Sequence, residues 1–243
     1  MSKKSSSKTN FLAQGTILVI ASFVAKAIGM IYRIPLTHIL GDDGNGYYST
    51  ANEIYTIILM ISSFSLPLAV SRLVAEREYA GEVKNSYRVL ICSLRFAAVT
   101  GGILSILTFL LGGVITKYVM GVELASYALR VLAPAIFLFA LTGVLRGFFQ
   151  GHGTMVPTAI SQIIEQVINA IISVAGAYVM LQYGLKLGEK KGDAELGTAL
   201  AAAGGTFGTV ASVGVALLFM IVIYLGYRNG FKRRMKKDKT RKR

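Results

Sequence analysis

The apolar stretch at residues 11–35 most constrains what this chain can fold into, because it carries two cations, Lys26 and Arg33, inside an otherwise membrane-like run. At a helical rise of about 1.5 Å per residue, roughly 24 residues cross a hydrocarbon core of about 30 Å with some tilt. At about 100° per residue, both cations fall on one narrow stripe together with Ser22 and Gly29. A cation facing lipid near the bilayer centre costs about 2.5–3 kcal/mol or more, so we expect this stripe to face protein or a wet cavity.

Two interpretations of these cations are open from the first stretch alone. Lys26 and Arg33 could extend toward the membrane surface, or pair with a carboxylate on a neighbouring helix. Alternatively, they could line a cationic cavity that receives an anionic substrate. The other helices decide between these interpretations.

The remainder of the chain repeats the apolar pattern, which predicts an all-α polytopic membrane protein. Of its 243 residues, 53% are hydrophobic, and a soluble domain of this length would not show repeated apolar runs of about 20 residues. The glycine, aspartate and asparagine residues at 41–46 predict a loop after the first span, and Pro67 predicts a break in the second. We expect six membrane-spanning helices, at residues 11–35, 50–71, 89–115, 125–146, 157–182 and 196–227.

Lysine and arginine are concentrated on one side of these predicted spans. They occur in the tail at 1–10, in the loop after the second span, at Arg146, which is assigned to the loop after the fourth span, and in the tail at 228–243. The positive-inside rule therefore predicts that both termini are cytoplasmic. The tail at 228–243 is expected to contact anionic lipids, or to connect two domains in a longer chain. Because the basic residues adjoin apolar spans, the net charge of +14 indicates membrane topology and not nucleic-acid binding.

Two further charged residues enter the predicted spans from the outer side. Glu53, in the second span, should lie at a depth similar to that of Arg33, so an ion pair between them and a functional role are equally open. Arg130 enters the fourth span from the same side. The segment at 157–182 carries a second polar stripe on one helical face, formed by Gln162, Glu165, Gln166 and Asn169.

Glu165 on this stripe is a candidate functional residue, since a carboxylate within a membrane span usually has a role and a partner. The candidate partners are Lys26 and Arg33. The alternative is a set of hydrogen bonds that clamps two helices together without touching a substrate. Pairs of small residues spaced four apart predict close helix packing, at Gly143 with Gly147 and at Gly204 with Gly208.

Several classes of site are excluded by residue types. Cys92 is the only cysteine, so an internal disulfide is impossible, and neither His38 nor His152 lies at a recognised metal-ligand spacing. No metal or other cofactor is predicted. An enzyme would need paired carboxylates, a serine–histidine arrangement or metal ligands, and the short loops leave no room for a catalytic domain.

Five segments of the sequence form a recognisable set. They are IGMIYRIPL at 28–36, GYY at 46–48, LPLAVSRLVAE at 66–76, RGFFQGH at 146–152 and PTAISQIIEQ at 157–166. In these segments the chain is similar to the polysaccharide-export and stage V sporulation protein B branch of the MATE-like flippases of the MOP superfamily, close to the MurJ-type lipid II flippases.

The resemblance implies a bacterial cytoplasmic-membrane transporter that exports undecaprenyl-pyrophosphate-linked sugars for peptidoglycan or surface polysaccharide. In that family two lobes enclose a cationic cavity, and this chain resembles the N-terminal lobe alone, so a second lobe is an expected partner. Lys26 and Arg33 occupy places comparable to arginines of the MurJ-type pattern, whereas Glu53 stands where that pattern has an arginine. Glu165 and Gln162 are expected to bind sugar hydroxyls or to pair with the cations.

Two other functions remain open besides this one. The first is a lobe of a cation-coupled MATE-like drug exporter, which would favour acidic cavity residues. The second is a membrane subunit or scaffold that does not transport.

Overall fold

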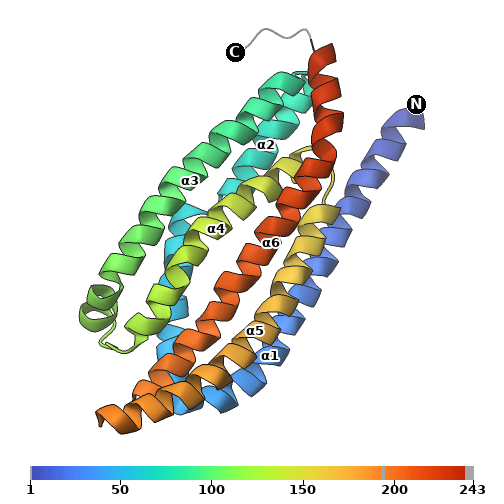
Figure 1. Cartoon of the computed structure of the whole chain (residues 1–243). Helices are drawn as coiled ribbons and strands as arrows, with labels where there is room; N and C mark the ends of the chain where they lie inside the picture. The colour runs from blue at the N-terminus through green and yellow to red at the C-terminus, as the bar shows by residue number, and fades with distance from the viewer. Residues whose placement is uncertain (1, 193–194, 239–243) are drawn as a thin grey trace.

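The computed structural model describes residues 2–192 and 195–238, with side chains described from residue 14 onward and not at 191. The described chain forms a bundle of long helices (Figure 1). These are α1 (Ser2–Ser62), α2 (Leu66–Tyr79), α3 (Val83–Val114), the short π-helix η1 (Ile115–Val119), α4 (Ala125–Gly151), α5 (Val156–Lys191) and α6 (Leu196–Lys237).

Helix α1 consists of two arms that meet at Gly41. Gly41 has φ 65° and ψ −172°, a conformation open to glycine and strained for other residues. The prediction of a loop over 41–46 is wrong, because only Gly41 leaves the helical conformation. Asp42 and Asp43 instead begin the second arm, where acidic side chains favour a helix N-terminus. In Figure 1 the chain runs down the first arm and returns along the second toward α2.

Five helical stretches of the described chain are long and apolar enough to cross a membrane. The first of them, Gln14–Tyr79, contains both arms of α1 together with α2. The predicted spans at 11–35 and 50–71 therefore lie in one helical stretch that reverses at Gly41. The predicted break near Pro67 is present, since α1 ends at Ser62 and α2 begins at Leu66. The start of α1 and the end of α6 lie at the same end of the bundle (Figure 1).

Three of the helices continue well past the predicted spans. Helix α4 reaches Gly151, α5 reaches Lys191 and α6 reaches Lys237. Charged residues end a membrane span without ending a helix, because lysine and arginine are good helix formers. Helix α5 ends only where Gly192 adopts φ 71°. The residues at 239–243 of the predicted basic tail lie outside the described part of the chain.

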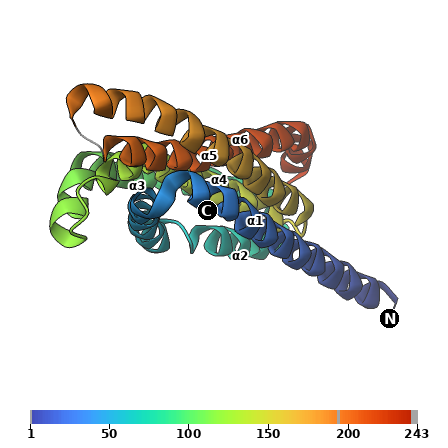
Figure 2. The ribbon, with the colours of Figure 1, turned by 90° about the horizontal axis from the view of Figure 1, so that it is seen from below.

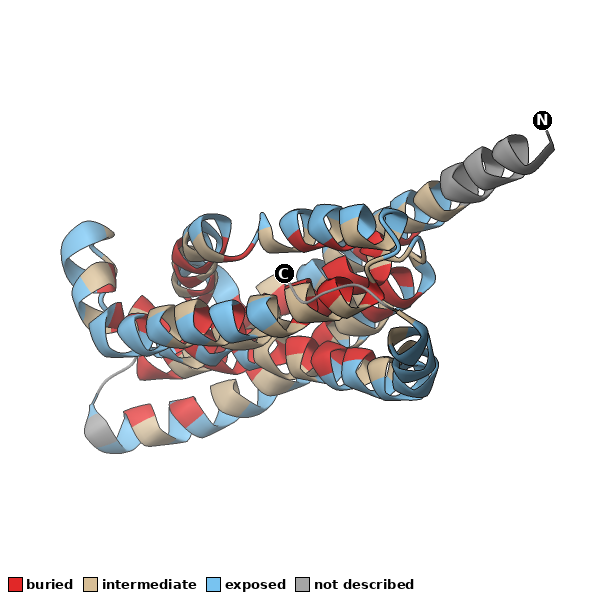
Figure 3. Ribbon diagram, turned by 90° about the horizontal axis from the view of Figure 1, so that it is seen from above, coloured by how far each residue is buried: buried red, intermediate tan, exposed pale blue. Residues whose placement is uncertain are grey.

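Helix α4 forms the centre of the bundle. Its buried side chains continue almost without interruption from Thr142 to Phe149, whereas the other long helices leave a wide apolar face exposed. Figure 3 shows the buried residues concentrated where helices face one another. Exposed apolar faces of this extent are expected where a helix meets lipid or a further protein surface.

The small residues predicted to allow close helix packing do so on both sides of the bundle. On α4, a Cβ at Gly147 would lie 2.5 Å from the carbonyl oxygen of Pro67 in α2. On α6, a Cβ at Gly208 would lie 2.1 Å from Oγ of Ser173 in α5. Figure 2 shows α5 and α6 lying against each other along their length. The predicted close-packing role of the two glycine pairs is confirmed.

Candidate functional site

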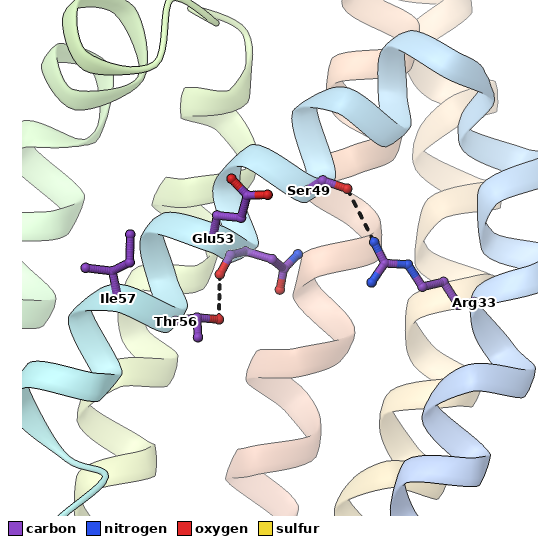
Figure 4. A pocket seen from close by; sticks show the side chains of 6 residues that line it. Arg33, Ser49, Glu53, Thr56 and Ile57 are labelled. Atoms are coloured by element: carbon purple, nitrogen blue, oxygen red, sulfur yellow. Dashed lines mark hydrogen bonds between the residues drawn. The ribbon is translucent and has the colours of Figure 1, made fainter.

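An open hollow with mostly polar lining residues lies between the two arms of α1. Its volume is about 540 Å³, and Arg33 on the first arm faces Ser49 and Glu53 on the second (Figure 4). Nη2 of Arg33 donates a hydrogen bond of 3.3 Å to Oγ of Ser49. The remaining lining residues are Asn52, Thr56 and Ile57.

A second hollow lies where α1 meets α5. It has a volume of about 470 Å³ and is lined by Lys26, Arg33 and Gln166, together with Ala25, Gly29 and Met30. Gly29 faces Gln166 across this contact, and a Cβ at Gly29 would lie 3.5 Å from Oε1 of Gln166, which is an ordinary van der Waals distance. Because Arg33 lines both hollows, they form one polar surface along α1, which we call the α1 cationic face.

The α1 cationic face brings together three of the predicted site residues, Lys26, Arg33 and Glu53. All three side chains are exposed, and none of them takes part in an ion pair among the described residues. Of the two roles left open for Glu53, the ion pair with Arg33 does not form: Arg33 contacts Ser49, one turn before Glu53. Arg33 retains further N–H donors, and Lys26 has three, so both can bind an anion.

Glu165 has a different partner from the one predicted. Its Oε2 accepts a hydrogen bond of 2.7 Å from Nη2 of Arg146, and Nε of Arg146 donates to Oγ of Ser161 at 2.9 Å. The side chains of Arg146 and Glu165 are only 9% and 14% exposed. The prediction that Lys26 or Arg33 pairs with Glu165 is wrong, because Glu165 points toward α4 and not toward α1.

Two further residues of the α5 polar stripe, Gln162 and Asn169, also serve helix contacts. Oγ of Ser22 donates to Oε1 of Gln162 at 3.1 Å. Asn169 is buried; it donates to the Tyr32 hydroxyl at 3.0 Å, and its Oδ1 accepts from Ser173 at 2.8 Å. The contacts of Gln162 with Ser22 and of Asn169 with Tyr32 join α1 to α5. They match the alternative in which the stripe clamps helices together.

Arg130 lies apart from the α1 cationic face. Its side chain packs along α3, with Nη2 located 3.1 Å from the position that a Cβ on Gly113 would take. It lines neither of the two hollows described above. The fold therefore separates Arg130 from the cations on α1.

Arg146 is the polar residue that sequence reasoning placed wrongly. Its charge suggested a loop at the membrane surface, yet it is 7% exposed and lies one turn before the end of α4. The glycines around Arg146 could have indicated its burial. The face of α4 formed by Gly143, Gly147 and Gly151 contacts α2, and this packing turns Arg146 toward α5. No group of three or more potential metal ligands converges anywhere in the described residues.

The comparisons with known proteins agree with this architecture. Residues 11–242 match the family model described as polysaccharide biosynthesis protein. The chain is 29% identical over 217 residues to stage V sporulation protein B of Bacillus subtilis (strain 168), covering 89% of this chain and 39% of that protein. It is 27% identical over 180 residues to the lipid II flippase MurJ of the same organism, covering 70% of this chain and 33% of MurJ.

A solved structure shares the fold. It is the outward-facing conformation of a multidrug resistance MATE family transporter of the MOP superfamily, with a TM-score of 0.73 at 18% identity. The match covers 91% of this chain and 46% of that transporter. The chain thus spans between a third and about two-fifths of the length of the two curated relatives, and somewhat less than half of the structural one.

Proposed function

The chain belongs to the polysaccharide biosynthesis protein family, and from that premise we propose that it forms one lobe of a flippase for undecaprenyl-pyrophosphate-linked sugars. The proposal draws support from the likeness to stage V sporulation protein B and to the lipid II flippase MurJ. The observation that carries it is the α1 cationic face, where Lys26 and Arg33 line one hollow without an acidic partner.

In this proposal the two arms of α1 cross the membrane separately, which brings the number of crossings to six. The break at Gly41 and the return of the chain toward α2 support that count. Both termini are then on the cytoplasmic side, in agreement with the distribution of lysine and arginine. The lobe works with a second lobe, in the same chain or another, because a cavity with alternating access needs two halves.

Lys26 and Arg33 bind the pyrophosphate in this proposal. They lie seven residues apart, which is about two helical turns, so both side chains can approach one ligand from the same side of α1. In a hollow partly screened from water, each charge-assisted hydrogen bond contributes about 1.5–3 kcal/mol. Gln166, which lines the same hollow, is placed to contact a sugar hydroxyl.

Binding of undecaprenyl pyrophosphate to the chain in lipid nanodiscs tests the proposal. We expect Lys26→Gln and Arg33→Gln each to weaken binding by about tenfold or more, as the loss of one charge-assisted hydrogen bond predicts. Arg130→Gln is the matched control, because it removes one exposed cation from outside the hollow. Equal binding by all three variants and the parent, at equal thermal stability, would contradict the proposal.

A MATE-like drug-export lobe is the second candidate, and Glu53 is the observation that favours it. Glu53 lines the hollow between the arms of α1, where a carboxylate could hold a cationic drug. A lobe of this kind would bind a cationic dye, lose that binding in Glu53→Gln, and show no preference for undecaprenyl pyrophosphate. A scaffold that does not transport would bind neither ligand.

A further inference from the structure

Three helices converge on one carboxylate at the end of the bundle opposite Gly41. Glu78 lies at the end of α2, His152 directly follows α4, and Arg234 lies in the last turns of α6. Phe231, one turn before Arg234, packs against the His152 ring with a centroid distance of 4.7 Å. We call these four residues the α6-end cluster. None of them belongs to the α1 cationic face.

The two oxygens of Glu78 face different partners. Oε2 accepts a hydrogen bond and ion pair from Nη2 of Arg234. Oε1 lies 3.2 Å from Nε2 of His152. The side chains of Glu78 and His152 are 15% and 9% exposed, whereas that of Arg234 is 52% exposed. One carboxylate is therefore held between an enclosed imidazole and a cation that can return to water.

The hydrogen bonds of His152 determine where a proton can bind. Nδ1 lies 2.8 Å from the carbonyl oxygen of Phe148 and must donate to it, because a carbonyl only accepts. In the neutral ring Nε2 then presents a lone pair to Oε1 of Glu78, which is also an acceptor. Both atoms are buried and have no hydrogen bond in the described structure. A proton on Nε2 would join them.

Burial opposes this protonation while α6 is docked. Desolvation lowers the pKa of His152 below its usual value; the hydrogen bond to Phe148 and the charge of Glu78 raise it in part, and the charge of Arg234 lowers it. The hollow beside the ring, of about 380 Å³, is also lined by Tyr227 and Thr154. Glu78 and Arg234 are thus the charged side chains that face His152.

We propose that His152 is a proton-binding site, and that the positive charge of the protonated imidazole repels Arg234, weakens the hold of Arg234 on Glu78 and loosens the end of α6 from α2 and α4. Linkage gives the direction of this effect. Docking of α6 disfavours protonation of His152, so protonation of His152 must in turn weaken the docking of α6. The stabilisation that neutral His152 gives to docked α6 is fully present above about pH 6.5, the usual pKa of histidine. It is lost as the pH falls below that value. This proposal does not depend on the substrate of the α1 cationic face.

A second contact between α6 and the rest of the bundle provides a control. Oδ2 of Asp238 accepts a hydrogen bond of 2.8 Å from the backbone N–H of Lys84. The backbone carbonyl of Asp238 accepts a second one, of 2.6 Å, from Nζ of Lys84. No histidine takes part in these contacts. Asp238→Ala, which removes the oxygen that accepts from Lys84, should therefore loosen the end of α6 to the same extent at each pH, whereas the contact at Glu78 should respond to pH.

Distances between two spin labels in the intact chain in nanodiscs test the loosening of α6. Cys92 is first replaced by serine, and labels are attached at Ala75→Cys on α2 and Lys237→Cys on α6, both exposed positions. At about pH 8 we expect one narrow distance distribution, and at about pH 5.5 a broader and longer one. His152→Gln, which cannot be protonated, should remove the pH response, and His38→Gln should preserve it. An unchanged distribution in the parent, or a full response in His152→Gln, would overturn the proposal.

Titration of the two histidines by NMR tests the same site, and it does not depend on whether the end of α6 separates from the bundle. His38 is exposed and serves as the internal reference. We expect Arg234→Gln to raise the pKa of His152 and Glu78→Gln to lower it, while His38 stays unchanged. A His152 pKa that neither variant moves would show that the imidazole does not share Glu78 with Arg234.

Discussion

Two regions of the molecule carry charged side chains in opposite surroundings. One is the contact between α4 and α5, and the other is the α1 cationic face. Arg146 and Glu165 lie between α4 and α5, nearly enclosed, and satisfy each other at 2.7 Å. Lys26 and Arg33 are exposed, and neither forms an ion pair within the described chain. The first pair is complete without any ligand. The second leaves hydrogen-bond donors that no acidic side chain of the described residues occupies.

Helix α5 contributes one residue to each of these two regions, although the two residues are adjacent in sequence. Glu165 and Gln166 are adjacent in sequence, but about 100° of helical rotation separates their side chains. Glu165 therefore reaches Arg146 on α4, while Gln166 lines the hollow with Lys26 and Arg33. A polar stripe on one helix can thus combine positions that pair with a neighbouring helix and positions that line a hollow, and only the neighbouring helices tell them apart.

Breaking the enclosed pair should have the largest effect on stability. Arg146→Met leaves Glu165 buried without its partner, and we expect the free energy of unfolding to fall by about 3–5 kcal/mol. Unfolding in mixed detergent micelles measures this loss. The double variant Arg146→Met/Glu165→Leu should recover most of it, because it leaves no uncompensated charge. A double variant as unstable as Arg146→Met would mean that packing, and not charge, explains the loss.

Overfilling the α5–α6 contact should have the next largest effect. In Gly208→Leu the new side chain meets Ser173, whose backbone nitrogen lies 2.5 Å from the Cβ position. Overpacking of this kind lowers the free energy of unfolding by about 1–3 kcal/mol. Gly226→Leu on the same helix is the matched control, since nothing lies within 4 Å of its Cβ position. Equal losses in the two variants would show that α5 and α6 can separate at no cost.

The sequence predicts the helical class, the closely packed glycine pairs and the cationic stripe, because each depends on local spacing along one helix. It misplaces Arg146 and the partner of Glu165, because a charge next to an apolar run has the same pattern whether it faces water or another helix. The residues at 41–46 show the same limit. Turn-forming residue types predict a six-residue loop there, but a single glycine at positive φ makes the reversal.

A smaller effect is expected from the hydrogen bonds that clamp α5 to α1. Asn169→Leu removes the bond of 3.0 Å to Tyr32 on α1, together with one of 2.8 Å to Ser173 on α5 itself. Hydrogen bonds between helices within membranes contribute about 0.6 kcal/mol each on average, so we expect the loss of the Tyr32 bond to cost about 0.6 kcal/mol. Thr100→Val is the control, because the hydroxyl of Thr100 bonds only to the Phe96 carbonyl on its own helix. An equal free energy of unfolding in Asn169→Leu and Thr100→Val would mean that Asn169 does not hold α5 to α1 and is instead available to a ligand.

Neutralising the exposed cations should change stability least, and this distinguishes the two surroundings most directly. Lys26→Gln and Arg33→Gln remove charges without leaving a buried partner, so we expect the free energy of unfolding to change by less than about 0.5 kcal/mol. The same unfolding titration, run beside Arg146→Met, measures the difference. A loss above about 1 kcal/mol in either variant would mean that the cation stabilises the lobe itself. The α1 cationic face would then be a second structural contact, and its donors would no longer be available for a pyrophosphate.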